Sequence, residues 1–527
     1  MAKQIFVIGI GGTGMRCIES FIHLCAIGMF DDTDVHMLAL DTDKDNGNFT
    51  RLKNLKEAYI KTKGVNKTQF ALKDTFFSAK LNYYQFSPDY SNISTFEAVY
   101  DYGDTKYSQP DKTAIADLLL TDGAKKFDLK HGYRAQTHLG SMLMYHSIID
   151  EIKRNDRGDL KKFIQELLSA STGGKPRVFI LGSVFGGTGA SSIPVIPKAI
   201  RKAASLISDA ADIEKNAFYG STLLTSYFSF PLPNDNEKEK QKIIATSDRF
   251  SLNSQAAMMF YESDDTVKRT YQKFYMMGTE TLDWKPIGKQ TQTITGGANQ
   301  ENDSHYIELL AAFAAYDFFN LSEKELDTLK EENKLEYLYR TFDENGKINF
   351  VDFIGSEKKE ELAKKMGLFT AMSFLTILDK YDFFEQAQIG GLKKVKIEGY
   401  EDIDPEEVTN LKTYMGLYHF YFKEGKLHDG WLKQLYRSSG GGDKFLFNPA
   451  LFGCESIREY ERFSFNDLIY KKNSDFELKK FKTGLLGSIY NEFFSEFIKS
   501  SEPTEITNKC EKLIKRTFDT LSKLYNF

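Results

Sequence analysis

The sequence predicts an α/β protein with a doubly wound parallel sheet, a long central helix and a second, helix-rich C-terminal domain. Three short, mostly apolar runs at residues 4–8, 35–40 and 177–181 suit strands that are buried on both faces. Residues 15–29, between the first two runs, carry apolar side chains at helical spacing. Parallel strands joined by a helix imply a right-handed crossover, which is typical of a doubly wound sheet.

The remaining elements follow in order along the chain. Residues 50–130 are rich in Tyr, Asn, Lys and Asp, and we expect a long, irregular excursion with short helices there. The apolar spacing predicts helices at residues 139–154, 160–168 and about 193–206, and a strand within 217–230.

A long helix at residues 302–319 is apolar on more than one face, so we expect it in the centre of the molecule. Residues 475–527 have mainly helical periodicity. We therefore predict a first domain at residues 1–320, with an insertion at about 50–130, and a divergent, helix-rich second domain at residues 321–527.

The composition excludes several classes of function. A net charge of −5 over 527 residues lacks the positive footprint of a general nucleic-acid binder. The four cysteines form no C-x-x-C pair, which argues against a metal finger. The first residues have no signal-peptide pattern, and no run approaches the ~20 apolar residues of a membrane span. We expect a cytoplasmic protein that binds no nucleic acid and has no membrane span.

Two glycine-rich turns follow predicted strands and precede helices. Residues 9–14 read Gly-Ile-Gly-Gly-Thr-Gly, and residues 186–190 read Gly-Gly-Thr-Gly-Ala. Such turns let phosphate oxygens approach the backbone, and the amides at a helix start point at the anion. A P-loop requires Lys followed by Ser or Thr after its last glycine, whereas Ala190-Ser191 stands there. Two lysine-free turns favour backbone amides and a metal ion as the groups that neutralise a triphosphate.

The first turn alone also fits a dinucleotide-binding fingerprint, in which Asp41 takes a ribose hydroxyl. A Rossmann-type oxidoreductase that uses NAD is therefore one alternative. This alternative gives the second glycine turn no task.

Four segments together resemble the nucleotide loops of the tubulin/FtsZ family, in the order of that family. They are residues 9–14, residues 40–43 (Leu-Asp-Thr-Asp), residues 132–140 (Gly-Tyr-Arg-Ala-Gln-Thr-His-Leu-Gly), and residues 185–191, which resemble the Gly-Gly-Gly-Thr-Gly-Ser-Gly signature. The resemblance covers about residues 1–320. It implies a GTPase that takes GTP or GDP, with ATP not excluded, together with Mg²⁺.

The resemblance also assigns site residues. The implied nucleotide-binding set is Gly11, Gly12, Thr13, Gly14, Asp41, Asp43, Arg134, Ala135, Gln136, Gly186, Gly187, Thr188, Gly189, Ala190, Asn302 and Asp303. Asp41 or Asp43 would hold Mg²⁺ through water. Asn302 and Asp303 would read the base from the start of the central helix, although a plain helix cap explains them equally well.

The family completes hydrolysis across a contact between subunits. Asp352 is the candidate for orienting the attacking water, and an ordinary acid at a strand end is the alternative. The resemblance implies head-to-tail self-assembly into filaments. The C-terminal region departs from the family pattern, so we also weigh a non-polymerising, nucleotide-dependent binding or signalling module with an unknown protein partner.

Overall fold

In the computed structural model of the protein, most of the chain is described, in ranges separated by gaps. The described residues are 3–63, 72–90, 95–99, 114, 117–126, 128–129, 133, 137–208, 213–229, 247–279, 297–300, 302–340, 351–378, 387–389, 393–395, 400, 403–424, 426–439, 452–460, 462 and 489–525.

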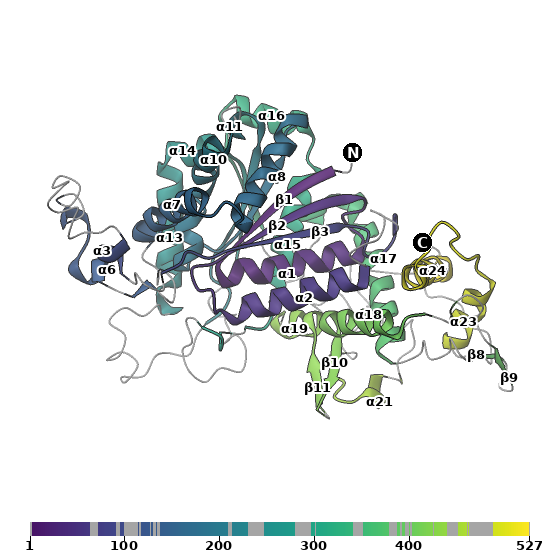
Figure 1. Ribbon diagram of the computed structural model, residues 1–527. Coiled ribbons are helices and arrows are strands. Elements are labelled where there is room, and N and C mark those ends of the chain that lie inside the picture. The colour runs from purple at the N-terminus through teal and green to yellow at the C-terminus, as the bar shows by residue number, and fades with distance from the viewer. Residues whose placement is uncertain are drawn as a thin grey trace.

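A parallel sheet forms the centre of the molecule (Figure 1). Within the described ranges it has seven strands, in the spatial order β3-β2-β1-β4-β5-β6-β7. The strands are β1 Lys3–Ile10, β2 Thr33–Leu40, β3 Lys80–Phe86, β4 Arg177–Leu181, β5 Phe218–Leu224, β6 Tyr271–Met277 and β7 Glu336–Arg340. Because β1 lies between β2 and β4, the strand order reverses at β1, as in a doubly wound sheet. The predicted α/β fold is confirmed.

Helices cover both faces of this sheet. Ile5 and Val7 of β1 belong to the core on one face, whereas Phe6 and Ile8 belong to the core on the other. Burial on both faces explains why the central strands are apolar without alternation.

The helices fall into two groups according to the core to which they contribute. The first group is α1 Gly11–Ile27, α2 Gly47–Lys63, α15 Tyr306–Asn320, α17 Val351–Ile377, α18 Pro405–Tyr418, α19 Trp431–Ser438 and α24 Lys509–Leu524. The second group is α7 Thr137–Arg154, α8 Asp159–Gly173, α9 Gly187–Ser192, α10 Ile196–Ile207, α13 Phe250–Ser263 and α14 Asp265–Thr270, of which α13 also contributes Phe250 to the first core. Shorter or more peripheral elements are α3 Phe96–Val99, α6 Asp122–Lys126, α11 Ile213–Asn216, η2 Ser247–Arg249, α16 Glu323–Glu331, α21 Ile457–Tyr460, α23 Ile489–Lys499 and the two-stranded pairs β8 Ala387–Ile389 with β9 Lys393–Val395 and β10 Phe420–Lys423 with β11 Lys426–Asp429.

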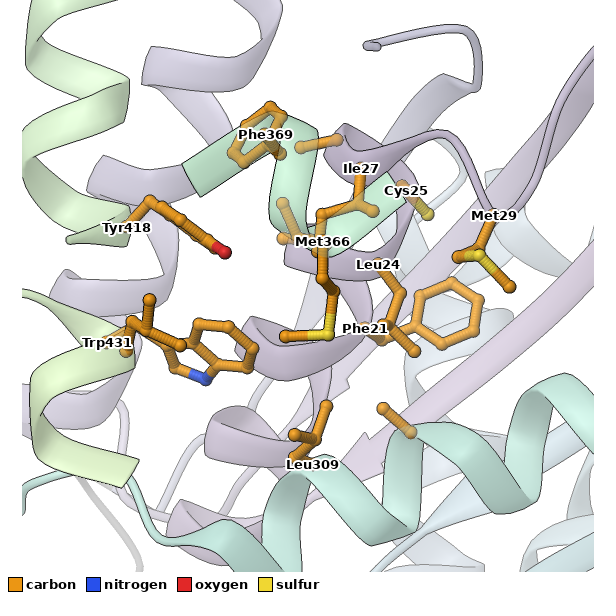
Figure 2. Close-up of a cluster of buried hydrophobic side chains, with 14 of the residues drawn as sticks. Phe21, Leu24, Cys25, Ile27, Met29, Leu309, Met366, Phe369, Tyr418 and Trp431 are labelled. Carbon is orange, nitrogen blue, oxygen red and sulfur yellow. The ribbon is translucent and has the colours of Figure 1, made fainter. Parts of the chain in front are cut away.

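Helix α1 is buried on all sides. Every residue of α1 except Gly12 is buried, because the sheet covers one side of the helix and the C-terminal helices cover the other. Figure 2 shows this second contact, in which Phe21 and Leu24 of α1 lie near Met366 of α17 and Trp431 of α19. The described helices α17, α18, α19 and α24, all beyond residue 320, therefore share one continuous hydrophobic core with the first part of the chain.

The structure differs from the sequence predictions at the edges of the sheet. Residues 50–130 are not simply an irregular excursion, because α2 begins at Gly47 and β3 is a strand of the main sheet. β3 reads Lys-Leu-Asn-Tyr-Tyr-Gln-Phe and is half-buried, so it lacks the apolar run that identifies a central strand. At the other edge, β7 extends the sheet beyond residue 320.

The central helix begins later than its sequence predicts. It starts at Tyr306, after an N-cap at His305, whereas the apolar spacing placed its start at residue 302. None of the helices in the described ranges has the length and apolar character needed to cross a membrane.

Candidate functional site

The two glycine turns meet at the carboxyl edge of the sheet. β1 and β4 are parallel neighbours, with Gly9 aligned to Leu181, so the turns that follow them emerge side by side. A Cβ at Gly14 would lie 2.7 Å from the carbonyl oxygen of Leu181, which leaves no room for a side chain. A Cβ at Gly11, where φ is +67°, would lie 3.6 Å from Cβ of Thr188 in the second turn. The two turns therefore approach each other closely.

Both turns present the N-terminus of a helix to this edge. Helix α1 begins at Gly11 and α9 at Gly187, and neither has a side-chain cap among the described residues. The first amides of an uncapped helix need hydrogen-bond acceptors, and the helix dipole adds positive potential. Among the described residues, a Cβ at Gly186 would meet only Ser183 Oγ, at 3.5 Å, so the backbone at this position of the second turn is accessible. These features fit a polyphosphate chain.

Two carboxylates follow β2 at the same edge. Asp41 and Asp43 are 3% and 5% exposed. Asp41 accepts hydrogen bonds from Asp43 N and Asn46 Nδ2, both at 3.3 Å. Asp43 accepts from Asp45 N at 3.2 Å and from Gly297 N. The two acids are therefore fixed in place by neighbouring amides.

A hydroxyl pair joins the carboxylate turn to the second glycine turn. The Oγ1 atoms of Thr42 and Thr188 lie 3.3 Å apart, within hydrogen-bond distance. The hydroxyl pair thus links the turn after β2 to the turn after β4, which also approaches the turn after β1 at Gly11.

Burial makes Asp41 an unusually weak acid. The pKa of Asp41 rises from 3.8 to about 7, mainly because burial removes solvation; the hydrogen bond from the Asp43 amide opposes this rise, and the negative charge of Asp43 adds to it. A buried acid beside a second acid is destabilised when ionised, and a divalent cation would relieve this cost. Mg²⁺ prefers carboxylate and water oxygens, so the pair fits a magnesium ion held through water.

The predicted base-reading residues lie before the central helix. Asn302 is 2% exposed. Its backbone carbonyl accepts a hydrogen bond from Arg51 Nη1 at 2.7 Å, and its backbone N–H donates to Asn48 Oδ1 at 3.5 Å. Asp303 follows it and is half-buried. Neither residue lies in the first turn of α15, and neither caps it, because His305 does so. Their proposed contact with a base remains a prediction.

Two other groups of predicted residues are only partly covered by the structure. Arg134, Ala135 and Gln136 lie outside the described residues. Asp352 lies in the first turn of α17, a helix rather than a strand end, and its side chain lies outside the described part of the chain.

Amide side chains that the sequence did not single out lie against the candidate site. Asn46 Nδ2 donates to Asp41 Oδ2 and also to Gln300 Oε1 at 2.9 Å, and Asn46 Oδ1 accepts from the backbone and side-chain amides of Asn48 at 2.9 Å. A Cβ at Gly12 would lie 2.9 Å from Asn48 Nδ2. Asn46 and Asn48 lie close to Asp41 in the sequence, and this nearness could have indicated them. Gln300 lies 254 residues from Asn46, so no local pattern indicates it.

A buried charged cluster lies directly behind the first glycine turn. Arg16 Nε of α1 pairs with Glu308 Oε1 of α15 at 2.6 Å, and both side chains are at most 2% exposed. Tyr227, just beyond β5, donates to the same carboxylate at 2.6 Å and accepts from Arg16 Nη2 at 3.1 Å. The cluster ties the start of the central helix to α1. Neither the glycine turns nor the apolar spacing predicts it.

Comparisons with known proteins give little that bears on this site. No protein-family model matches the chain, and no curated protein matches it. Among solved structures, the chain is similar to Clostridium botulinum phage c-st TubZ (C-terminal tail truncated protein), at 13% identity and a TM-score of 0.24. The match covers 62% of this chain and 64% of the TubZ chain, so this chain spans less than two thirds of the length of that protein.

Proposed function

We propose that this chain binds a nucleoside triphosphate, with Mg²⁺, at the edge where β1, β2 and β4 end. One observation supports this function most strongly: two glycine turns from neighbouring strands lie close together with a pair of buried acids beside them, and each turn starts a helix that has no side-chain cap within the described ranges. Ligands of open α/β sheets bind at the carboxyl ends of the strands where the strand order reverses, and β1 is that point here.

In this proposal, different groups of the chain bind the phosphates and the cation. Amides of residues 11–14 and 186–190 hold phosphate oxygens, and the hydroxyl of Thr188 adds a donor. Asp41 and Asp43 would hold Mg²⁺ through water. The cation supplies the positive charge that a lysine supplies in a P-loop.

A guanine nucleotide, its hydrolysis and head-to-tail self-assembly belong to the same proposal, and the sequence resemblance alone supports them. Asp352 stays the proposed residue for orienting water across the subunit contact. Electron microscopy and light scattering with GTP and with a slowly hydrolysed analogue test assembly. Monomers under both conditions would favour the non-polymerising binding or signalling module.

The identity of the ligand can be tested without assuming it. The protein is purified without added nucleotide and denatured, and the released small molecules are identified by mass. We expect GDP or GTP. Release of a nicotinamide dinucleotide would overturn the proposal.

The NAD-dependent alternative is included in this test because one observation favours it. The order β3-β2-β1-β4-β5-β6 also occurs in dinucleotide-binding sheets, with an acid at the end of β2 for the ribose. Against it, the second glycine turn lies next to the first and would have no role in that chemistry.

A further inference from the structure

The segment before α15 connects the candidate site to the C-terminal helices. We define the bridging segment as residues 297–300 and 302–305. At its first end, Gly297 N donates to Asp43 Oδ2, and the carbonyl of Gly297 accepts from Gly47 N at 3.3 Å. Gln300 Oε1 accepts from Asn46 Nδ2, which also holds Asp41. At this end, Gly297 therefore contacts Asp43 directly, and Gln300 contacts Asp41 through the side chain of Asn46.

The other end of the bridging segment is held by α19. Gln434 Oε1 accepts from Ser304 N at 2.8 Å, and Ser438 Oγ accepts from Tyr306 N, the first residue of α15, at 3.0 Å. Both bonds go to backbone amides, so they fix the path of the chain rather than one side chain.

Arg51 of α2 adds a second anchor at this end. Its guanidinium donates to the carbonyl of Asn302 and to Ser304 Oγ, each at 2.7 Å, and to Gln434 Oε1 at 2.6 Å. It also pairs with Glu19 of α1 at 2.8 Å. Because Gln434 contacts both Ser304 and Arg51, its side-chain oxygen joins α19 to two partners at once.

Helix α19 is itself fixed relative to the first glycine turn. Trp431 is fully buried, its Nε1 donates to Ser20 Oγ of α1 at 3.1 Å, and its ring lies 4.5 Å from that of His23. Helix α1 begins at the glycine turn, so α19 is held against the same helix that carries the phosphate-binding backbone.

We propose that Gln434 and Ser438 are positioning residues for the candidate site. They hold the bridging segment in the place where Gly297 and Gln300 keep Asp43 and Asn46 oriented, and so they set the geometry of the acids from a helix that is distant in sequence. The inference rests on the proposed function, because it concerns how the same site is held for a magnesium–nucleotide complex.

Substitutions on α19 test this inference with a closely matched control. Ser438 and Ser439 are adjacent and each donates to the carbonyl three residues earlier, but only Ser438 bonds α15. We expect Ser438→Ala and Gln434→Ala each to weaken the binding of GTP with Mg²⁺ by about five- to tenfold, which is the usual effect of one or two lost hydrogen bonds. Ser439→Ala should bind as the parent does. Gln434→Glu keeps an acceptor for Ser304 and Arg51 but loses the donor to the carbonyl of Asp429, so it should bind more tightly than Gln434→Ala without reaching the affinity of the parent.

A fluorescence signal separates positioning from loss of fold. The chain has two tryptophans, so Trp284→Phe leaves Trp431 as the single reporter. Because coupling between sites is reciprocal, adding Mg²⁺ and GTP should change the emission of Trp431. This change should persist with Ser439→Ala and disappear with Ser438→Ala, while thermal unfolding shows that each variant is folded.

The outcomes distinguish the two proposals. If the parent binds GTP with Mg²⁺ and all α19 variants bind equally, without a change in Trp431 emission, the positioning role is wrong and the proposed function stands. If the parent binds no nucleotide in calorimetry, the proposed function is wrong, and the inference that rests on it falls as well. If Gln434→Ala does not fold, the comparison of Ser438→Ala with Ser439→Ala decides.

Discussion

Replacing Asp41 by Asn should stabilise the ligand-free protein above neutral pH. The folded-state pKa of Asp41 is about 7, against 3.8 for an ordinary aspartate, because the buried carboxylate has lost its solvation. Between these two values the folded protein keeps a proton that the unfolded chain releases, so stability falls as pH rises through this window. A shift of about three units corresponds to about 4 kcal/mol at ~1.4 kcal/mol per unit.

The net effect is smaller, because Asn is not a perfect replacement. Asp41 Oδ2 accepts from Asn46 Nδ2, and that amide cannot simply flip, since Asn46 Oδ1 is already bonded to Asn48. The substituted side chain would place its own amino group against this donor, at a cost of about 1 kcal/mol. We therefore expect Asp41→Asn to raise the free energy of unfolding by about 3 kcal/mol at pH 8 and to leave it nearly unchanged at pH 5.

Urea unfolding at pH 5 and pH 8 measures this difference, with Asp45→Asn as the matched control. Asp45 lies in the same turn but is exposed, so its replacement should change stability by less than about 0.5 kcal/mol at either pH. Calorimetry of the same variants should show that Asp41→Asn loses Mg²⁺-dependent nucleotide binding. The substitution stabilises the protein by removing the negative charge that we propose for binding the cation. Equal destabilisation at both pH values would contradict our explanation of the acid pair.

Three further predictions concern the frame around the site. Burial lowers the pKa of His305 and His419 from 6.5 to about 3, so the unfolded chain binds protons on these side chains at pH values where the folded protein does not. As the pH falls from 6 to 4, the two histidines should together contribute a loss of stability of up to about 2.7 kcal/mol per pH unit, against a gain of about 1.4 kcal/mol per unit from Asp41. In urea unfolding, His419→Gln should remove about half of the histidine contribution to this slope, and an unchanged slope would argue against neutral buried histidines. Arg16→Ala should destabilise the protein by about 3–5 kcal/mol, because the buried Glu308 carboxylate then lacks its ion-pair partner. In thermal unfolding, the double variant with Glu308→Gln should recover part of this loss, whereas additive losses would contradict the pairing. A chain ending at residue 320 should be insoluble, because it exposes the face of α1 that α17, α18 and α19 cover. A soluble fragment that unfolds cooperatively would show that the first part of the chain folds without this shared core.

The centre of the sheet was predictable from sequence because its chemistry is local. β1, β2 and β4 are apolar on both faces, and each is followed by glycine or aspartate within a residue or two, so strand, turn and helix follow from neighbouring residues. The two glycine turns follow β1 and β4, which are neighbouring parallel strands, and this pairing places the turns close together. Edge strands were harder, since β3 is half-buried and its alternation is interrupted by tyrosines and polar residues.

The supporting contacts of the site could not be predicted for a different reason. The capping of α15 by His305 departs from the usual preference for Ser, Thr, Asp or Asn, so the helix start was placed too early. Ser304 and Arg51 lie 130 and 383 residues from Gln434, and only the folding of α19 against α1 brings the three together. A single sequence carries no local signal for such contacts.

Calorimetric titration of the ligand-free protein with GTP, in the presence and absence of Mg²⁺, tests the central claim most directly. Our account predicts saturable heat with one site per chain, and clearly tighter binding when Mg²⁺ is present. The absence of heat with every purine triphosphate tried, with Mg²⁺ in excess, would contradict it.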